Sequence, residues 1–347
     1  MASIAGKTQR TRRGTSRATV KMTDVARMAG VSSMTVSNTF KFPDKVVPET
    51  RQKVLDAAKA LGYIPNLIAG ELASGRSRVV AAITPSIRNS DFADMIMGLA
   101  AALNQDGYQL VLSVIARPAR DHAAVRTLIG RRVDGIVLTG ADRDATTRNL
   151  IKKSEMPVVE TWDLDGPFID MGVGFDNRQA ALDANRLLVD RQRRKIGCMI
   201  FDTVQSGRLA RRLEGYKEAM QEAGLQDDLI VRVPFDSGFA GGKLGLAQLM
   251  EREPALDGLF CVTDVLATGA TFECMERKIS IPEQVAIIGF GDYELSSAIP
   301  HGLSSIRTPG KLIGTTAARM ILDRVDGATA GNHVENVGYT LIQRGSC

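Results

Sequence analysis

The residues of this chain that could do chemistry are polar side chains that follow predicted strands. Side chains at the carboxyl ends of parallel strands meet along one edge of a sheet, where ligands bind. Asn, Asp and Arg give directional hydrogen bonds, and an aromatic ring packs against the C–H face of a sugar. The pattern predicts a site for a small polar ligand. The residues at these positions are Asn89, Asp91, Phe92, Glu160, Trp162, Asp176, Asn177, Thr263 and Asp264, and Arg212, near the start of a predicted helix, completes the set.

Each of these residues has a plainer interpretation when it is taken alone. Asp176 and Asp264 can cap helices, because a carboxylate there accepts hydrogen bonds from free backbone amides. Trp162 is the only tryptophan and can simply fill a core. The grouping of the set at strand ends, and not any single residue, favours ligand binding.

No motif for catalysis, a metal or a cofactor emerges from the sequence. Gly289 and Gly291 begin a dinucleotide-binding fingerprint, but Glu294 occupies the position of its third glycine. Gly241-Gly242-Lys243 is followed by Leu244, where a phosphate-binding loop needs Ser or Thr. The histidines, His122, His301 and His333, are far apart, and the four cysteines form no C-x-x-C pair. We therefore expect a protein that is not an enzyme, with reduced thiols and no metal or cofactor.

A second candidate site lies in residues 22–47, whose pattern predicts two short helices joined by a turn. Thr23-Asp24 can open the first helix, and Gly30 ends it. Ser32 can cap a second helix over residues 33–40, in which Met34, Val36 and Phe40 alternate with small polar residues. A helix-turn-helix of this kind places its second helix in the major groove of DNA. An ordinary helical hairpin is the alternative.

The segments that follow complete a small helical head and connect it to the rest of the chain. Pro48 precedes a third predicted helix over residues 49–61, which Gly62 ends. Pro65 then favours an extended linker. The next segment, residues 67–74, predicts a weak helix because it is short and contains Gly70.

Charge separates this head from the remainder of the chain. Residues 1–78 hold 14 Lys and Arg against 5 Asp and Glu, whereas residues 79–347 hold 30 against 34. A basic head on a slightly acidic body indicates that the head binds a polyanion. The first twenty residues are basic and have no apolar stretch typical of a secretion signal, so we expect a disordered arm and a cytoplasmic protein.

The body alternates short apolar runs with amphipathic stretches, which predicts two parallel-sheet subdomains covered by helices. Four strands form each set, with a cleft between the two subdomains. The predicted strands are residues 79–84, 109–114, 134–139, 157–161, 196–201, 229–233, 258–262 and 285–290. The predicted helices include residues 92–104, 179–190, 208–223 and 245–252.

The fold class is thus a small all-α helix-turn-helix head plus a two-lobed α/β body. The predicted domains are a disordered basic arm (1–20), the DNA-binding head (21–64), a hinge helix or linker (65–78) and an effector-binding and dimerisation body (79–347). No run of 18 apolar residues is present, so no membrane span is expected.

This combination resembles the lac-repressor (LacI) family of bacterial transcription regulators, whose body is similar to that of periplasmic binding proteins. The resemblance rests on TDVARMAGVSSMTVSNTF, TRQKVLDAAKALGYIPN and AGELASG, and on DGIVL, VGFDN, RRLEGYKEAM, LDGLFCVTDVLATGA, VAIIGFGD and LIQRGS in the body. It runs from residue 22 to the C-terminus. PVVE, VGFDN, LFC and ATFEC are most similar to the gluconate and 2-ketogluconate repressors.

The resemblance implies a homodimer that binds a palindromic operator and is released when a sugar acid binds between the lobes. The implied DNA-binding residues are Thr23, Ser32, Ser33, Met34, Thr35, Ser37, Asn38, Tyr63, Asn66, Ala69 and Leu72, of which Ala69 and Leu72 would enter the minor groove. The implied effector-binding residues are Asn89, Phe92, Glu160, Trp162, Asp176, Arg212, Asp264 and Asp292. Arg212 would hold the carboxylate of the effector.

Three residues depart from the family pattern. Asn38 replaces a common Arg, Gly70 replaces a usual Arg or Gln, and Gly291 stands where the family often has Asp. The chain also ends without a leucine-heptad tail, which favours a dimer over a tetramer. Two alternatives remain: a regulator of this family with another sugar or nucleobase effector or a co-repressor response, and a plain sugar-binding protein.

Overall fold

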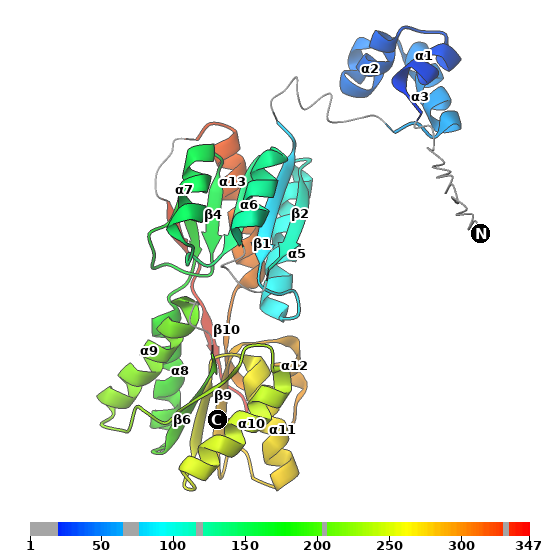
Figure 1. The fold of residues 1–347 in the computed structure, drawn as a ribbon. Helices are drawn as coiled ribbons and strands as arrows, with labels where there is room; N and C mark the ends of the chain where they lie inside the picture. Colours follow the sequence, from blue (N-terminus) through cyan, green and yellow to red (C-terminus); the bar gives the residue numbers. More distant parts are fainter. Residues whose placement is uncertain (1–19, 65–75, 116–120, 203–206, 329–332) are drawn as a thin grey trace, which may run out of the picture. The chain divides into compact units, whose positions relative to one another are not determined.

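The computed structural model describes residues 20–64, 76–115, 121–202, 207–328 and 333–347. Backbone contacts divide the chain into two units, Met1–Gly75 and Arg76–Cys347 (Figure 1). The predicted arm, apart from residue 20, and the predicted hinge segment 67–74 lie outside the described residues, as do Asn66, Ala69 and Leu72.

The first unit holds three helices around a small core. They are α1 (Met22–Ala29), α2 (Ser33–Lys41) and α3 (Pro48–Leu61), with the short 3-10 turn η1 (Pro43–Lys45) before α3. The core consists of Val25 and Ala26 from α1, Val36 from α2, and Val54, Ala57 and Ala58 from α3. Gly30 and Gly62 end α1 and α3 in the left-handed conformation, with φ of 68° and 64°, which a residue without Cβ adopts at low cost.

Two local predictions in this unit differ from the structure. Helix α1 begins at Met22, one residue before Thr23, and Lys21 is its N-cap; the carboxylate of Asp24 accepts a hydrogen bond from the Lys21 amide at 3.0 Å. Met34 was grouped with the apolar residues of α2, yet its side chain is 69% exposed. Val36 and the partly buried Phe40 carry the packing of α2 instead.

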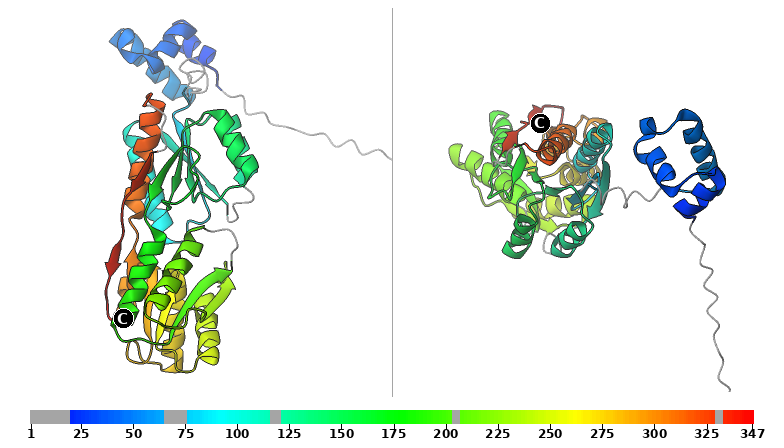
Figure 2. Two further views of the ribbon diagram at one scale, coloured as in Figure 1. Left: turned by 90° about the vertical axis from the view of Figure 1, so that its left-hand side faces the viewer. Right: turned by 90° about the horizontal axis from the view of Figure 1, so that it is seen from above.

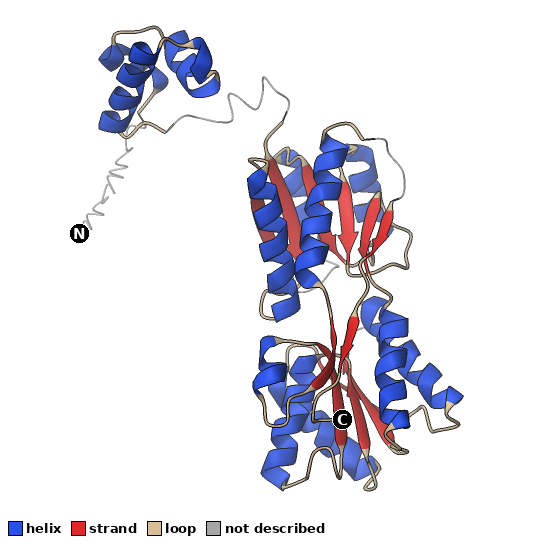
Figure 3. Ribbon diagram, turned by 180° about the vertical axis from the view of Figure 1, so that it is seen from behind, coloured by secondary structure: helices blue, strands red, loops and turns tan. Residues whose placement is uncertain are grey.

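The second unit consists of two lobes, each a sheet between two layers of helices (Figure 3). The N-terminal lobe has the strand order β11-β5-β4-β3-β1-β2. Its strands are β1 (Val79–Thr84), β2 (Gln109–Val114), β3 (Gly135–Thr139), β4 (Val158–Thr161), β5 (Met171–Gly174) and β11 (Val334–Asn336). Its helices are α5 (Ser90–Gln105), α6 (Asp121–Gly130), α7 (Ala145–Ser154) and α13 (Gly310–Val325).

Alternation along β1 explains the layers of this lobe. Val80 and Ala82 face the core that includes α5 and α13, whereas Ala81 and Ile83 face the core formed with α6 and α7. Both faces of the strand are covered, which is why its sequence is a continuous apolar run and does not alternate with polar residues.

The C-terminal lobe repeats this arrangement with the strand order β12-β10-β9-β8-β6-β7. Its strands are β6 (Ile196–Asp202), β7 (Ile230–Pro234), β8 (Gly258–Cys261), β9 (Ala286–Gly291), β10 (Ser304–Arg307) and β12 (Thr340–Ile342). Its helices are α8 (Asn177–Asp190), α9 (Gly207–Glu222), α10 (Gly238–Arg252), α11 (Asp264–Arg277) and the short α12 (Glu294–Ala298).

The chain passes between the lobes three times: after β5, after β10 and between β11 and β12. Helix α13 therefore packs on α5 of the N-terminal lobe although it follows β10 of the other lobe, and the last strand returns to the C-terminal lobe (Figure 2). The sequence prediction of four strands in each lobe was incomplete, because it missed β5, β10, β11 and β12. These strands have only three or four residues each, and β12 pairs antiparallel to β10.

Within the described residues, no helix is long and apolar enough to cross a membrane. The four cysteines, Cys198, Cys261, Cys274 and Cys347, are buried and form no disulfide.

Candidate functional site

The exposed N-terminal half of α2 forms the candidate DNA-reading surface. Ser32 caps the helix: its hydroxyl oxygen accepts a hydrogen bond from the Thr35 amide at 3.1 Å and lies 2.9 Å from the Thr35 hydroxyl. Ser33 and Met34 are exposed beside this cap, and Thr35, Ser37 and Asn38 are partly buried. The surface offers short hydroxyl and amide groups and one flexible apolar side chain, which suit base edges and methyl groups in a major groove.

The helix is held in place from its opposite side. Val36 is fully buried, and Thr39 donates its hydroxyl to the Thr35 carbonyl at 2.9 Å. Tyr63, after α3, packs against Phe40 with ring centres 6.1 Å apart. Tyr63 therefore supports α2 in this structure, while Thr23 is exposed in the first turn of α1.

A cavity of about 110 Å³ lies between the two lobes of the second unit. The N-terminal lobe contributes the segments that follow β1 and β3 and the start of α6, and the C-terminal lobe contributes α9 and the ends of β6 and β7. Its lining residues are Ile83, Thr84, Pro85, Ser86, Asn89, Asp91, Phe92, Ile115, Asp121, Thr139, Gly140, Asp142, Arg143, Phe201, Arg208, Leu209, Arg212, Phe235, Thr263 and Tyr293.

Of the eight predicted effector-binding residues, the structure brings three to this cavity: Asn89, Phe92 and Arg212. Arg212 is 5% exposed and firmly held. Its Nε donates to Asn177 Oδ1 at 2.9 Å, and its Nη1 donates to the Val262 carbonyl at 2.8 Å. Its central guanidinium carbon lies 3.5 Å from the centre of the Phe290 ring. Burial, together with the charge of the neighbouring cation Arg208, lowers the pKa of Arg212 to about 9.

Phe92 and Trp162 belong to an aromatic row that joins the lobes. Phe92 meets Trp162 edge-on at 5.3 Å, Trp162 meets Phe175 at 6.5 Å, and Phe175 stacks on Phe290 at 6.1 Å. Trp162 is fully buried behind Phe92, so it supports the cavity wall without lining it. Its Nε1 donates to the Met95 sulfur at 3.0 Å.

Glu160 also lies behind the wall. It is fully buried, and burial raises its pKa. Its Oε2 accepts from the Ile169 amide at 2.6 Å, and its Oε1 lies 3.6 Å from Arg143 and 4.0 Å from Arg148. Glu160 therefore acts on the cavity only indirectly. Through its ion pair with Arg143 it orients a side chain that lines the cavity.

Asp176, Asp264 and Asp292 do not line the cavity. Asp176 caps α8 by accepting from the Gln179 amide at 2.8 Å, which was the plainer interpretation of this residue. Asp264 is buried next to the N-cap Thr263 of α11 and accepts three hydrogen bonds, from the hydroxyls of Ser296 and Ser305 at 2.6 Å each and from the Tyr293 amide at 2.9 Å. Burial raises the pKa of Asp264 to about 6.

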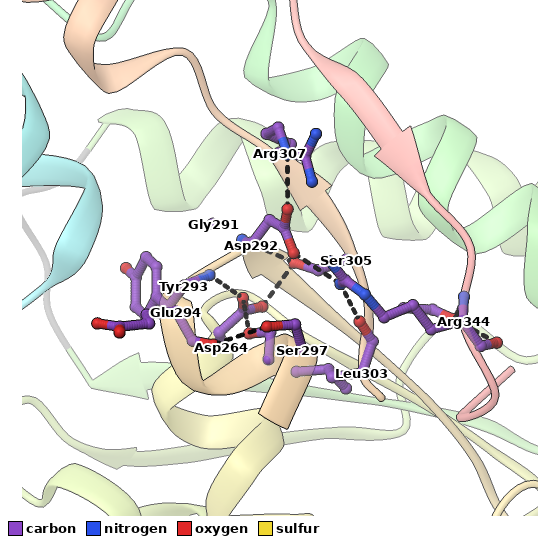
Figure 4. A network of polar contacts seen from close by, with 12 residues as sticks. Asp264, Gly291, Asp292, Tyr293, Glu294, Ser297, Leu303, Ser305, Arg307 and Arg344 are labelled. Atoms are coloured by element: carbon purple, nitrogen blue, oxygen red, sulfur yellow. Dashed lines mark hydrogen bonds and ion pairs between the residues drawn. The ribbon is translucent and has the colours of Figure 1, made fainter. Parts of the chain in front are cut away.

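Asp292 connects two segments that run between the lobes (Figure 4). Its Oδ2 accepts from Arg307 Nε at 2.7 Å, and its Oδ1 accepts from Arg344 Nη1 at 2.6 Å. Arg307 ends β10 just before the chain enters the N-terminal lobe, and Arg344 follows β12, which receives the chain from that lobe. Asp292 thus fastens both crossings next to Tyr293, which does line the cavity.

Several lining residues were not predicted from sequence. Arg208 lies one helical turn before Arg212, and this i, i+4 spacing was a usable signal. Arg143 and Asp142 directly follow β3, a strand end whose polar residues the sequence analysis left out. Tyr293 lies two residues after β9, so the strand-end rule could have found it as well. Asp121 gave no comparable signal, because its position depends on how α6 packs. Within the described residues, no group of acidic, histidine and cysteine side chains is arranged to hold a metal ion.

Each of the two units is similar to a known protein family. Residues 21–66 match the bacterial regulatory proteins of the lacI family, and residues 186–347 match a periplasmic binding protein-like domain. The chain is 32% identical over 328 residues to the HTH-type transcriptional regulator GntR of Escherichia coli, covering 93% of this chain and 97% of that protein.

Solved structures show the same fold. A LacI family transcriptional regulator from Silicibacter pomeroyi is similar with a TM-score of 0.87 at 30% identity, covering 94% of this chain and 99% of that one. A complex of the transcriptional regulator CelR with cellobiose has a TM-score of 0.71 at 27% identity, covering 94% and 100%. From the helix-turn-helix head, the two-lobed body and these similarities over nearly the whole chain, we conclude that this protein belongs to the LacI family and is a DNA-binding transcriptional repressor.

Proposed function

We propose that the repressor is controlled by a small sugar acid of the gluconate or 2-ketogluconate type, bound in the cavity between the lobes. The observation that carries this proposal is that Arg212 is buried and hydrogen-bonded but has no carboxylate partner among the residues that the structure describes. Two of its three guanidinium nitrogens are held by protein groups, and within the described residues no carboxylate lies within ion-pairing distance of it. Because a buried cation is costly when it has no counter-ion, a ligand carboxylate is the natural partner.

The opposite wall of the cavity suits the hydroxyl groups of such a ligand. Three residues that line this wall each have a buried polar atom without a hydrogen-bond partner in the described part of the chain: Asp121 Oδ1, Thr139 Oγ1 and Arg143 Nε. They comprise an acceptor, a hydroxyl and a donor, which together match the mixed character of sugar hydroxyls. An unpaired buried polar group costs about 1–3 kcal/mol, so a polyol that pairs with all three gains affinity by satisfying them.

The sequence resemblance to gluconate and 2-ketogluconate repressors supports the same ligand class, and the similarity to the CelR regulator in complex with cellobiose supports a sugar-like ligand. Phe92 and Phe235 supply apolar ring surface in the cavity for the C–H face of the carbon chain.

For the DNA-bound state we propose a homodimer on a palindromic operator, acting in the cytoplasm. Strand β2 lies at the edge of its sheet and exposes Val111, Leu112 and Val114, and Met97 of α5 is exposed as well. An exposed apolar edge strand is a surface that soluble proteins normally cover. Sedimentation analysis of the full chain tests this: a dimer is expected, and Val111→Lys with Val114→Lys should shift it toward monomer.

The proposed domain roles follow the sequence analysis: a basic arm over residues 1–20, a DNA-binding head over 21–64, a hinge over 65–78, and an effector-binding and dimerisation body over 79–347. Effector binding releases the operator. To change operator occupancy from about 99% to 1%, the ligand must favour the released state by about 5.5 kcal/mol.

A band-shift titration with the natural operator tests the effector. Gluconate or 2-ketogluconate should release the DNA from the unmodified protein, and Arg212→Ala should remove this response while operator affinity stays near normal. If no sugar acid changed operator affinity, the proposed effector would be wrong. If Arg212→Ala instead lost operator binding, the role given to Arg212 would be wrong.

A further inference from the structure

We propose that Asp91 selects the charge of the effector, because its carboxylate lies in the same cavity as Arg208 and Arg212 and limits this arginine pair to a singly charged acidic group. The inference rests on the proposed function, which supplies an acidic ligand. It goes beyond that function by separating carboxylate ligands from phosphorylated ones.

The two arginines form one anion-binding pair. They lie four residues apart on α9, so their side chains leave the same face of the helix, and both line the cavity. Among the described residues, neither has a carboxylate within 4 Å, in contrast to Arg143 in the same cavity, which lies 3.4 Å from Asp121. Two guanidiniums without a close carboxylate partner would suit a phosphate dianion well, since arginine recognises phosphate and carboxylate alike.

Asp91, which lies on the facing lobe, offsets part of the positive charge of the two arginines. It is 8% exposed in the first turn of α5, and its Oδ1 accepts a hydrogen bond from the Phe92 amide at 2.8 Å. The next residue, Phe92, carries the Arg208 guanidinium over its ring at 5.3 Å, which brings Arg208 close to Asp91. Burial raises the pKa of Asp91, whereas the charge of Arg212 and then that of Arg208 act in the opposite direction.

The other acidic residues that line the cavity have partners of their own. Asp121 pairs with Arg143, and Asp142 accepts a hydrogen bond from the Gly207 amide at the start of α9. The charges of Asp142 and of Asp163, which does not line the cavity, also act on Arg208 and so add to the effect of Asp91. Asp91 also interacts with the side chain of Tyr293, but among the lining carboxylates it is the one whose charge acts on both Arg212 and Arg208.

The consequence depends on the number of charges that the ligand carries. A carboxylate brings one negative charge, whereas a phosphate ester brings about 1.5 to 2 near pH 7. Each added charge is repelled by Asp91 at short range in a partly dehydrated cavity, where an effective dielectric constant of about 20 keeps the interaction strong. The unmodified protein should therefore prefer a sugar acid to a sugar phosphate of the same carbon number.

Calorimetric titration of the full chain at pH 7.5 with D-gluconate and with glucose 6-phosphate tests the proposal. Both probes have six carbons and one acidic end, but they differ in charge. Asp91→Asn keeps the shape of the side chain and an oxygen that can accept from the Phe92 amide. We expect the ratio of the two dissociation constants to move toward glucose 6-phosphate by roughly tenfold or more in Asp91→Asn.

Asp165→Asn is the matched control. It removes the same charge from an exposed position outside the cavity, next to Arg211, and should leave the ratio unchanged. Thermal unfolding and operator binding of Asp91→Asn show whether the variant is folded; if it is not, Asp91→Ser serves in the same titration.

The outcomes separate this inference from the proposed function. If the unmodified protein binds gluconate and the ratio stays the same in the folded Asp91 variant, the charge-selection inference is overturned while the proposed function stands. A preference of the unmodified protein for glucose 6-phosphate also overturns it. If neither probe nor 2-ketogluconate binds any of the proteins, both proposals fail.

Discussion

The guanidinium of Arg212 lies over the ring of Phe290, with its central carbon 3.5 Å from the ring centre. Phe290 belongs to β9 and is followed closely by Asp292, which fastens the two crossing segments through Arg307 and Arg344. A ligand that binds Arg212 therefore contacts a side chain that packs directly on β9. This strand leads to Asp292 and so to the two segments that cross between the lobes. In the function proposed above, this contact is what would couple the ligand to the geometry between the lobes.

Replacement of Arg212 by lysine should weaken effector binding by at least tenfold, although the charge is kept. Lysine cannot donate at once to Asn177, to the Val262 carbonyl and to a ligand in the fixed geometry of a guanidinium, and it stacks less well on Phe290. Calorimetric titration with the sugar acid measures the change. Arg211→Lys is the control, because Arg211 pairs with Glu214 on the outside of α9. Equal affinities in the two variants would contradict the assigned role.

The buried carboxylate of Asp264 should make stability depend on pH in a defined direction. Burial raises its pKa in the folded protein from 3.8 to about 6, so the folded state binds a proton more tightly than the unfolded chain does. The contribution of Asp264 to stability is therefore most favourable near pH 4 and is lost as the pH rises toward 6, by up to about 3 kcal/mol.

Denaturant unfolding of the unmodified protein and of Asp264→Asn between pH 4 and pH 7 measures this effect. The variant removes the titrating group, so the difference between the two unfolding free energies should change over that range. The exposed Asp236→Asn variant is the matched control for the loss of one carboxylate. A constant difference for Asp264→Asn would mean that this carboxylate is not the group that titrates.

Much of the fold was predictable because it depends on local patterns. All eight predicted strands exist, and their continuous apolar runs reflect sheets that helices cover on both faces. The missed strands have a physical reason. Residues 340–342 form a strand only because β10 is there to pair with them, and the preceding helix α13 belongs to the other lobe. No local pattern encodes that pairing.

The cavity was predictable to a smaller extent. Asn89 and Phe92 follow β1, and Arg212 was expected both from its place near the start of a helix and from the family resemblance, so local position and a motif were enough for them. Asp264 and Asp292 carry the right chemistry, but packing turns them toward Ser305 and the two crossing arginines instead of the cavity. Asp121 reaches the cavity because α6 begins there, which depends on how α6 packs against the sheet.

Two nearby residues of α2, Met34 and Val36, allow DNA contact and stability to be tested separately. Met34 is 69% exposed, so Met34→Ala should leave thermal stability nearly unchanged but weaken operator binding by at least fivefold, consistent with about 1 kcal/mol or more for a base contact. Val36 is fully buried, so Val36→Ala should cost about 1–3 kcal/mol of stability in the first unit.

Fluorescence anisotropy with labelled operator and thermal unfolding of the isolated residues 20–64 give the two readouts. Each variant serves as the control for the other. If Met34→Ala unfolded the head, or if its operator affinity equalled that of the unmodified protein, α2 would not present Met34 to DNA.

Helices α5 and α13 pack so closely that a single methyl group should disturb them. A Cβ at Gly98 would lie 2.3 Å from the Lys311 carbonyl oxygen, and one at Gly314 would lie 2.0 Å from the Met95 carbonyl oxygen. Backbone atoms on a neighbouring helix cannot yield without moving the whole helix, so Gly98→Ala should destabilise the second unit by about 1–3 kcal/mol. Gly130→Ala, at the end of α6 with open space around it, is the matched control and should be nearly neutral.

Because α5 carries Asp91 and Phe92, Gly98→Ala should also weaken effector binding, and calorimetry on the same samples checks this. Unchanged stability and affinity in Gly98→Ala would show that the two helices separate at little cost.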